Sequence, residues 1–83
     1  MWAAWWDWEL DTSNPHLGKR MRERGFNEVE LRIMIIQAER WWFGETTRRY
    51  EVQTVHAGKR WHVILEPDFD EEVIIVVTAY PVE

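Results

Sequence analysis

The chain has no cysteine, and only 3 of its 83 residues are proline and 4 are glycine. Without cysteine it forms neither a disulfide nor a thiolate metal site, which is typical of proteins in a reducing compartment. No apolar run is long enough to span a bilayer, and the first residues lack the basic start of a secretory signal. We therefore expect a single cytoplasmic domain over residues 1–83, with no membrane segment.

The signatures of several chemistries are also missing. The sequence contains no glycine-rich phosphate loop, no nucleophile elbow and no dinucleotide fingerprint. Its histidines, His16, His56 and His62, do not have the spacing of zinc ligands, and the acidic run at 68–72 has no glycine of the kind that a calcium loop needs. We expect neither a metal nor a cofactor.

Charge is unevenly distributed along the chain. The net charge of −5 argues against attraction of nucleic acid by the whole surface. Two basic segments, residues 15–25 and 48–60, nevertheless lie between acidic ends. Whether these segments meet in space decides whether a polyanion can bind.

Tryptophan is abundant, and the 7 Trp and 3 Phe must supply much of the core of so small a domain. Each large aromatic side chain buries about 150–250 Å². Near the amino terminus Trp6, Trp8 and Leu10 alternate with acidic residues, and this period of two predicts an edge strand with one apolar face. A hydrophobic tail or a dimer contact is the alternative for this segment.

Capping residues predict a first helix. Asn14 suits an N-cap and the following proline suits the first helical position, so that the helix is expected over Pro15–Arg24 and ends at Gly25. Its apolar residues, Leu17 and Met21, are four apart and therefore share the buried face.

A second helix follows directly. Asn27 and Glu30 have the spacing of a capping box, and Phe26 before the cap is placed to pack on Leu31 as a hydrophobic staple. This helix is expected to reach about residue 38. Its predicted core face consists of Leu31, Met34, Ile35 and Ala38. The segment after it, Trp41–Gly44, fits either a short strand or a loop that covers the core.

The remainder predicts an antiparallel meander. A two-residue loop at Ala57–Gly58 places apolar residues opposite apolar residues and polar opposite polar, whereas a slip of one residue mixes them. The predicted pairs are Tyr50 with Leu65, Val52 with Val63, Thr54 with Trp61, Arg49 with Glu66 and Gln53 with His62. Together with the helices, this predicts an α+β fold in which two N-terminal helices pack on a small antiparallel sheet.

Residues 73–80 form an almost continuously apolar strand of the kind that is central in a sheet. The number of residues in the preceding turn, odd or even, decides which side chains of this strand are buried. With a five-residue loop the core face receives Val73, Ile75, Val77 and Ala79, and the opposite face receives Thr78 and Tyr80 together with Arg49, Arg60 and His62. A four-residue loop reverses these faces.

The first helix carries the residues with the clearest chemical potential. His16, Arg20 and Arg24 are spaced four apart and form one column on the helix surface. Cleavage of RNA by its own 2′-OH requires a base, an acid and cations around the phosphate. A histidine titrates near neutrality and serves either role, guanidinium groups bind phosphate oxygens, and a tyrosine such as Tyr80 donates a proton or positions the phosphate.

Each of these residues also has a structural interpretation. His16 is then a polar residue of the first helical turn, the two arginines of the column pair with acidic side chains, and Arg49 forms a cross-strand ion pair with Glu66. Thr78 and Tyr80 then end a central strand, and Trp61 belongs to the core instead of stacking on a base.

Four segments together resemble a family: Trp8-Glu9-Leu10, His16-Leu17-x-x-Arg20-Met21-x-x-Arg24-Gly25-Phe26, Glu66-Pro67-Asp68 and Val77-Thr78-Ala79-Tyr80. They are similar to a small family of uncharacterised domains grouped with the BrnT-type and RelE-type toxins of bacterial toxin–antitoxin systems. The resemblance implies an α+β fold and a metal-independent endoribonuclease acting on RNA, with an antitoxin as protein partner. RelE-type nucleases are usually basic, and this chain is acidic.

From chemistry and resemblance together we expect His16, Arg20 and Tyr80 to be catalytic, and the substrate phosphate to bind Arg24, Arg49, Arg60 and Thr78. The rival hypothesis is a non-catalytic interaction module that forms a dimer or binds a protein partner through its Trp-rich surface. The acidic charge, the Trp-rich amino end and the apolar Trp41–Phe43 segment favour it.

Overall fold

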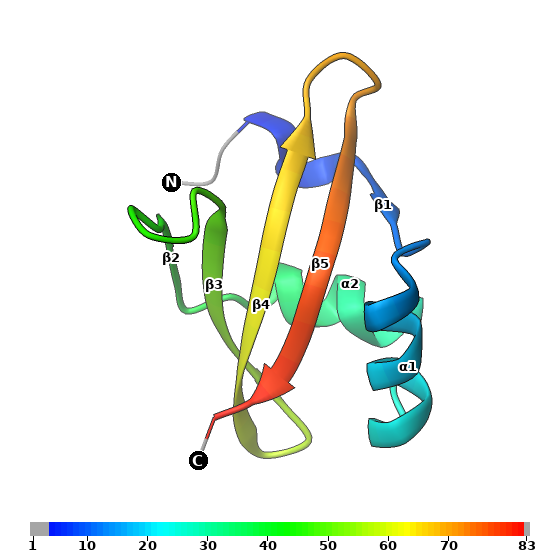
Figure 1. The fold of residues 1–83 in the computed structure, drawn as a ribbon. Helices are drawn as coiled ribbons and strands as arrows, with labels where there is room; N and C mark the ends of the chain where they lie inside the picture. Colours follow the sequence, from blue (N-terminus) through cyan, green and yellow to red (C-terminus); the bar gives the residue numbers. More distant parts are fainter. Residues whose placement is uncertain (1–3, 83) are drawn as a thin grey trace.

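Two helices and a five-stranded sheet make up residues 4–82, the part of the chain that the computed structural model describes (Figure 1). The elements in chain order are a 3₁₀ turn η1 (Ala4–Asp7), β1 (Glu9–Asp11), α1 (Pro15–Arg24), α2 (Glu28–Ile36), β2 (Arg40–Phe43), β3 (Tyr50–His56), β4 (Lys59–Asp68) and β5 (Val73–Pro81). The strand order is β1-β5-β4-β3-β2. β1 runs parallel to β5 and the other neighbours are antiparallel, so the predicted α+β fold is confirmed, with β5 inside the sheet and β1 at its edge.

The amino-terminal strand is shorter than expected. Only Glu9–Asp11 pair with β5, while residues 4–7 form the 3₁₀ turn. Trp5 and Trp6 are adjacent and both buried. A strand sends neighbouring side chains to opposite faces, so an edge strand with one covered face would leave one of the two exposed, whereas a turn of helix can bury both. The strand prediction for Trp6 was therefore wrong, and that for buried Leu10 was right.

Both helices begin as their caps predicted. The Asn14 side chain accepts a hydrogen bond from the backbone N–H of His16, and Gly25 ends α1 in the left-handed region with φ 69°. Asn27 and Glu30 form both bonds of the capping box at α2. α2 ends at Ile36, slightly before the expected limit, although Ala38 is still buried.

The end of α2 is tied to the sheet by a buried hydroxyl. Thr54 of β3 is fully buried, and its Oγ1 donates a 2.5 Å hydrogen bond to the carbonyl of Met34. This carbonyl belongs to the last turn of the helix, where backbone acceptors lack partners within the helix. The bond therefore satisfies a buried polar group on each element.

The β3–β4 hairpin has the predicted register throughout. Val52 faces Val63, Thr54 faces Trp61 and Gln53 faces His62. Ala57 and Gly58 have φ 52° and 76°, the left-handed values of a tight hairpin turn whose twist matches that of the strands. The sequence allowed either a strand or a loop for the Trp41–Gly44 segment. All of it except Gly44 lies in β2, the edge strand beside β3.

The set of alternate β5 residues that points into the core changes part-way along the strand. Residues 69–72 form a four-residue loop, so the second of the two alternatives holds for the first half of β5. Ile74 and Val76 are buried in the core, whereas Val73, Ile75 and Val77 are only partly buried. The register then shifts between Ile64 and Leu65 of β4. This bulge adds one residue to β5 and reverses the alternation. Beyond it Ala79 is buried, the position that only the five-residue alternative gave it.

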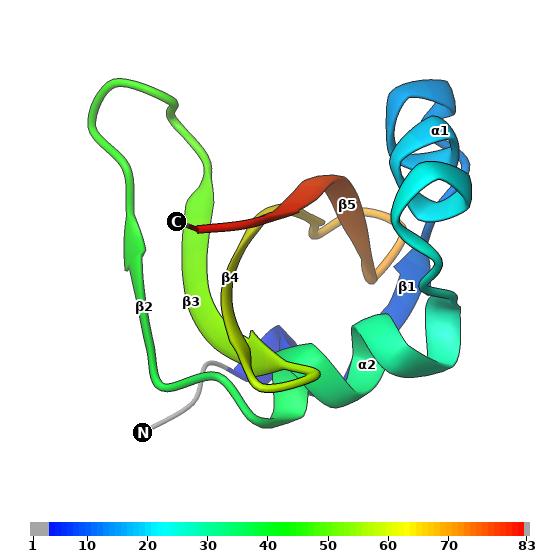
Figure 2. The same ribbon diagram turned by 90° about the horizontal axis from the view of Figure 1, so that it is seen from below.

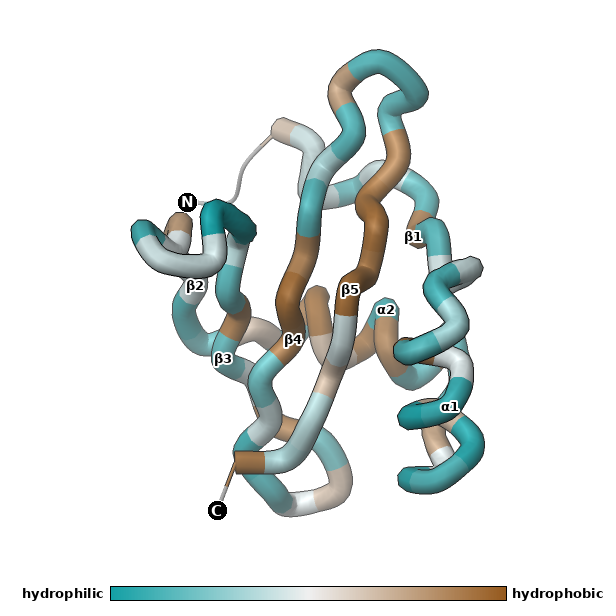
Figure 3. The backbone as a smooth tube through the Cα atoms, in the orientation of Figure 1, coloured by the Kyte–Doolittle hydropathy of each residue, from teal (hydrophilic) through white to brown (hydrophobic). Residues whose placement is uncertain are grey.

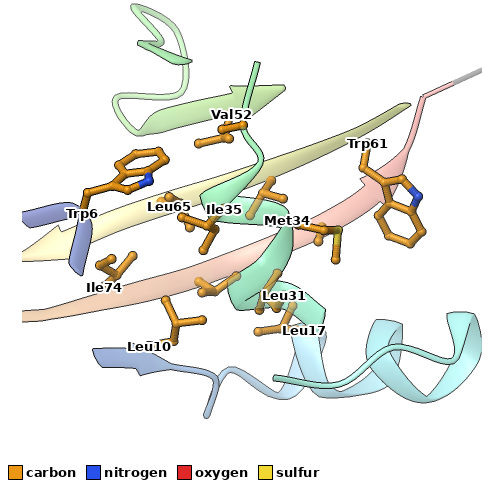
Figure 4. Close-up of a cluster of buried hydrophobic side chains, with 14 of the residues drawn as sticks. Trp6, Leu10, Leu17, Leu31, Met34, Ile35, Val52, Trp61, Leu65 and Ile74 are labelled. Atoms are coloured by element: carbon orange, nitrogen blue, oxygen red, sulfur yellow. The ribbon is translucent and has the colours of Figure 1, made fainter. Parts of the chain in front are cut away.

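The sheet curves around α2, which lies along its concave side, while α1 lies beside β5 (Figure 2). Apolar residues concentrate in the middle of β4, β5 and α2 (Figure 3). In the close-up of the core, Leu31, Met34 and Ile35 of α2 lie among Leu17, Val52, Leu65 and Ile74 (Figure 4). No helix within residues 4–82 is long and apolar enough to cross a membrane.

Candidate functional site

The face of the sheet opposite the core carries a polar row that crosses four strands. Arg40 pairs with Gln53, Gln53 with His62, and His62 with Tyr80. Because paired residues of neighbouring strands point to the same side, all four side chains belong to one face. This outer face is the one turned toward the reader in Figure 1, with α2 behind the sheet.

His62 and Tyr80 make the closest polar contact of this row. The His62 Nδ1 lies 3.2 Å from the Tyr80 hydroxyl oxygen, with the two rings nearly perpendicular and their centroids 5.7 Å apart. Both residues are half-buried. An imidazole and a phenol at hydrogen-bonding distance can exchange or share a proton.

Trp42 of β2 extends this pair. Its ring makes a T-shaped contact with the His62 ring at a centroid distance of 5.6 Å, and the guanidinium of Arg40 lies over the indole at 5.2 Å. Arg40, Trp42, His62 and Tyr80 form what we call the outer-face cluster. It combines a cation, two aromatic rings and a titratable group, all at least partly accessible to solvent.

Several predicted residues also lie on this face. Thr78 precedes Tyr80 by two positions on β5 and pairs with Ile64, and exposed Arg60 precedes His62 by two positions on β4. Residues two apart in a strand are separated by about 6.6 Å and share a face. The structure therefore places Tyr80, Thr78 and Arg60 on the outer face, with Thr78 and Arg60 on opposite sides of the His62–Tyr80 pair. The five-residue alternative for the preceding turn predicted this face, but the loop has four residues and the bulge in β5 restores the arrangement.

Arg49 lies further away. Its Nε is 3.9 Å from a carboxylate oxygen of Glu66, which confirms the ion-pair interpretation. Glu66 is four residues from His62 along β4, about 13 Å. Another acid, Glu51, pairs with Trp42 across β2 and β3 and accepts a 3.3 Å hydrogen bond from Thr47. The outer face thus has positive charge near His62 and mixed charge toward its other end.

The column on α1 stands apart from the cluster. His16 and Arg24 are exposed and Arg20 is half-buried, and within residues 4–82 none of the three side chains has an ion pair or a hydrogen bond. The expectation that both arginines pair with acidic side chains therefore finds no support in the described residues. α1 lies beside β5, but the carboxyl end of β5 runs away from it (Figures 1 and 2).

His62 was not among the site residues predicted from the sequence. The predicted register already placed it opposite Gln53, and one choice of loop length placed it beside Tyr80. His16 was predicted in its place because it lies in the motif that resembles the toxin family. Arg40 and Trp42 were missed because nothing in the sequence distinguished a strand from a loop after α2.

Residues 4–82 contain no group of three or more histidine, aspartate or glutamate side chains placed to hold a metal ion. Comparisons of the chain with known protein families, with curated proteins and with solved structures gave no match. The resemblance to toxin ribonucleases therefore stays a prediction from sequence motifs.

Proposed function

We propose that the outer face of the sheet binds single-stranded RNA and that His62 and Tyr80 cleave it by transferring protons, without a metal ion. The observation that carries this proposal is the 3.2 Å contact of His62 Nδ1 with the Tyr80 hydroxyl, beside an accessible tryptophan ring. It retains the predicted role of Tyr80 and assigns the role predicted for His16 to His62.

The reaction divides between the two side chains. With Nδ1–H donating to the Tyr80 oxygen, Nε2 of His62 is left to accept the proton of the ribose 2′-OH. The 2′ oxygen attacks the adjacent phosphorus, the bond to the 5′ oxygen breaks, and the Tyr80 hydroxyl donates its proton to that oxygen. The products are a 2′,3′-cyclic phosphate and a free 5′-OH. Acid–base catalysis of this kind contributes roughly 10²–10⁴-fold to a rate.

Binding would depend on stacking and on charge. A base stacked on an aromatic side chain contributes about 1–3 kcal/mol without sequence preference. Trp42, a half-buried ring on the edge strand β2, is the side chain we assign to this contact. Arg40 and Arg60 would bind phosphate oxygens next to His62. Farther along the RNA, His16, Arg20 and Arg24 on α1 and Thr78 on β5 would bind the backbone. The positive charge of the two arginines would offset the acidic net charge.

The test is cleavage of a mixed-sequence RNA in EDTA by the wild type and by His62→Ala, Tyr80→Phe and His16→Ala variants, with product ends mapped for cyclic phosphate. We expect both outer-face variants to lose at least about 100-fold in rate, and His16→Ala to lose less than about tenfold. Near-ultraviolet circular dichroism confirms that each variant is folded.

Three outcomes would overturn the proposal. Absence of cleavage by the wild type favours the non-catalytic interaction module. Wild-type rates in His62→Ala and Tyr80→Phe place the chemistry elsewhere. A loss of cleavage rate in His16→Ala alone would place the catalytic site on α1, as the resemblance to toxin ribonucleases implies.

A further inference from the structure

The helix α2 has an apolar stripe that faces away from the core. Leu31, Met34 and Ile35 are fully buried, whereas Val29, Ile33 and Ile36 are 69%, 44% and 61% exposed. The three exposed residues are spaced four and three apart, so they form one line along the helix. A surface helix ordinarily carries polar residues on the side away from the core. This second apolar stripe adds nothing to the core of the described chain.

A groove runs beside the stripe. Its lining consists of Glu9, Leu10, Glu28, Val29, Arg32 and Ile33, and its volume is about 400 Å³. Leu10 of β1 is the buried apolar residue of this lining. The groove therefore continues the apolar surface of α2 onto the neighbouring edge of the sheet.

The walls of the groove are held in place. Arg32 donates one hydrogen bond to the carbonyl of Trp6 at 2.9 Å and another to the carbonyl of Trp8. These bonds attach η1 and the residue that precedes β1 to α2, so the groove exists before any partner binds. They also direct the guanidinium toward neutral carbonyl groups of the backbone.

The charge at the rim is acidic. Glu9 and Glu28 are both exposed, and within residues 4–82 neither carboxylate has an ion pair or a hydrogen bond. Two copies of the chain packed through this face would set one acidic rim against another, because a two-fold contact joins identical surfaces. A basic partner instead complements the rim.

We propose that this groove binds an amphipathic helix of a protein partner, which places apolar side chains on Val29, Ile33 and Ile36 and Lys or Arg side chains opposite Glu9 and Glu28. α2 is nine residues long, about 13.5 Å, which matches two to three turns of a partner helix. The groove and the outer-face cluster lie on opposite sides of the molecule, since α2 lies on the concave side of the sheet (Figure 2). This proposal does not depend on the proposed RNA cleavage.

The test uses the full chain and two synthetic 14-residue peptides, both with leucine on one helical face, one flanked by lysine and the other by glutamate. Fluorescence anisotropy measures affinity, and methyl resonances of Val29, Ile33 and Ile36 locate the contact. We expect the lysine peptide to bind and to shift these resonances. Ile33→Ser should weaken binding at least about tenfold, and the Glu9→Gln/Glu28→Gln double variant about fivefold.

The matched control is Val55→Ser, which removes an apolar side chain of comparable exposure (37%) on the outer face of the sheet. It should bind the lysine peptide as the wild type does. Equal affinity for both peptides, methyl shifts confined to other residues, or no binding of the lysine peptide would each overturn the proposal. So would a wild-type dimer that Ile33→Ser converts to a monomer, since a second copy would then cover the groove. RNA cleavage by Ile33→Ser reports separately on the outer face.

Discussion

His62 and Tyr80 lie 3.2 Å apart, Nδ1 to Oη, on the far side of a register shift in the β4–β5 ladder. Before the shift, alternate residues of β5 point into the core at Ile74 and Val76. After it, Ala79 points inward and Tyr80 outward. Without the bulge, the register that pairs Leu65 with Val76 would continue along the strands. Tyr80 would then lie opposite buried Trp61 and point into the core. The candidate site therefore exists because of one extra residue in β5.

Removal of the Tyr80 hydroxyl is expected to change the tautomer of neutral His62. In the proposed site the Tyr80 oxygen accepts from Nδ1–H, which leaves Nε2 unprotonated. Tyr80→Phe removes this acceptor, so the population should shift toward the Nε2–H form. Long-range ¹H–¹⁵N NMR distinguishes the two forms. An unchanged tautomer ratio would show that the hydroxyl does not set the orientation of the imidazole proton.

Two neighbouring isoleucines of α2 should differ sharply in their effect on stability. Ile35 is fully buried and Ile36 is 61% exposed. Ile35→Ala should lower the free energy of unfolding by about 2–5 kcal/mol, since it leaves a cavity in the core. Ile36→Ala should change it by less than about 0.5 kcal/mol. Urea denaturation measures both. Equal losses would mean that the outer stripe of α2 is covered in the free protein.

The β3–β4 turn offers a stabilising substitution. Ala57 has φ 52°, a left-handed conformation that disfavours an L-residue with a Cβ atom. Asparagine tolerates this conformation, and Asn-Gly is the preferred pair for such a hairpin turn. Ala57→Asn should therefore raise the free energy of unfolding by about 0.5–1 kcal/mol.

The control for the turn is Gly58→Ala, at φ 76°. It should lower stability by about 1 kcal/mol. If Ala57→Asn also destabilises the protein in urea, the turn does not limit the stability of the hairpin.

The Asp11 carboxyl is expected to contribute to acid sensitivity. Hydrogen bonds from the Ser13 hydroxyl and then from its backbone N–H hold the pKa of Asp11 below its ordinary value, against a small opposing effect of burial. A carboxyl whose pKa is lower in the folded than in the unfolded state stabilises the fold above its unfolded pKa. This stabilisation is lost as the pH falls through the folded pKa.

Ser13→Ala removes the larger of these bonds. NMR titration of the Asp11 side chain should then give a higher pKa than in the wild type. The variant should also lose less stability than the wild type between neutral pH and the acid limit of the Asp11 titration. An unchanged Asp11 pKa would mean that the backbone N–H alone accounts for the shift.

Local features of this protein could be read from its sequence because their causes are local. The caps at Asn14 and Asn27 depend on side chains that bond to backbone groups two or three residues away. The β3–β4 register follows from the Ala57–Gly58 turn and the matching of apolar partners. Alternation along β4 likewise placed Arg60 and His62 on one face.

What the tertiary structure alone decided depends on contacts between distant segments. The joint burial of Trp5 and Trp6 against Trp41 and Tyr50 turns the amino end into a 3₁₀ helix instead of a strand. Pairing with β3 makes residues 40–43 a strand, which sets Trp42 against His62. The bulge in β5 reconciles a four-residue loop with the burial of Ala79. Sequence periodicity cannot specify these outcomes, because each is set by contacts with residues that are distant in the sequence.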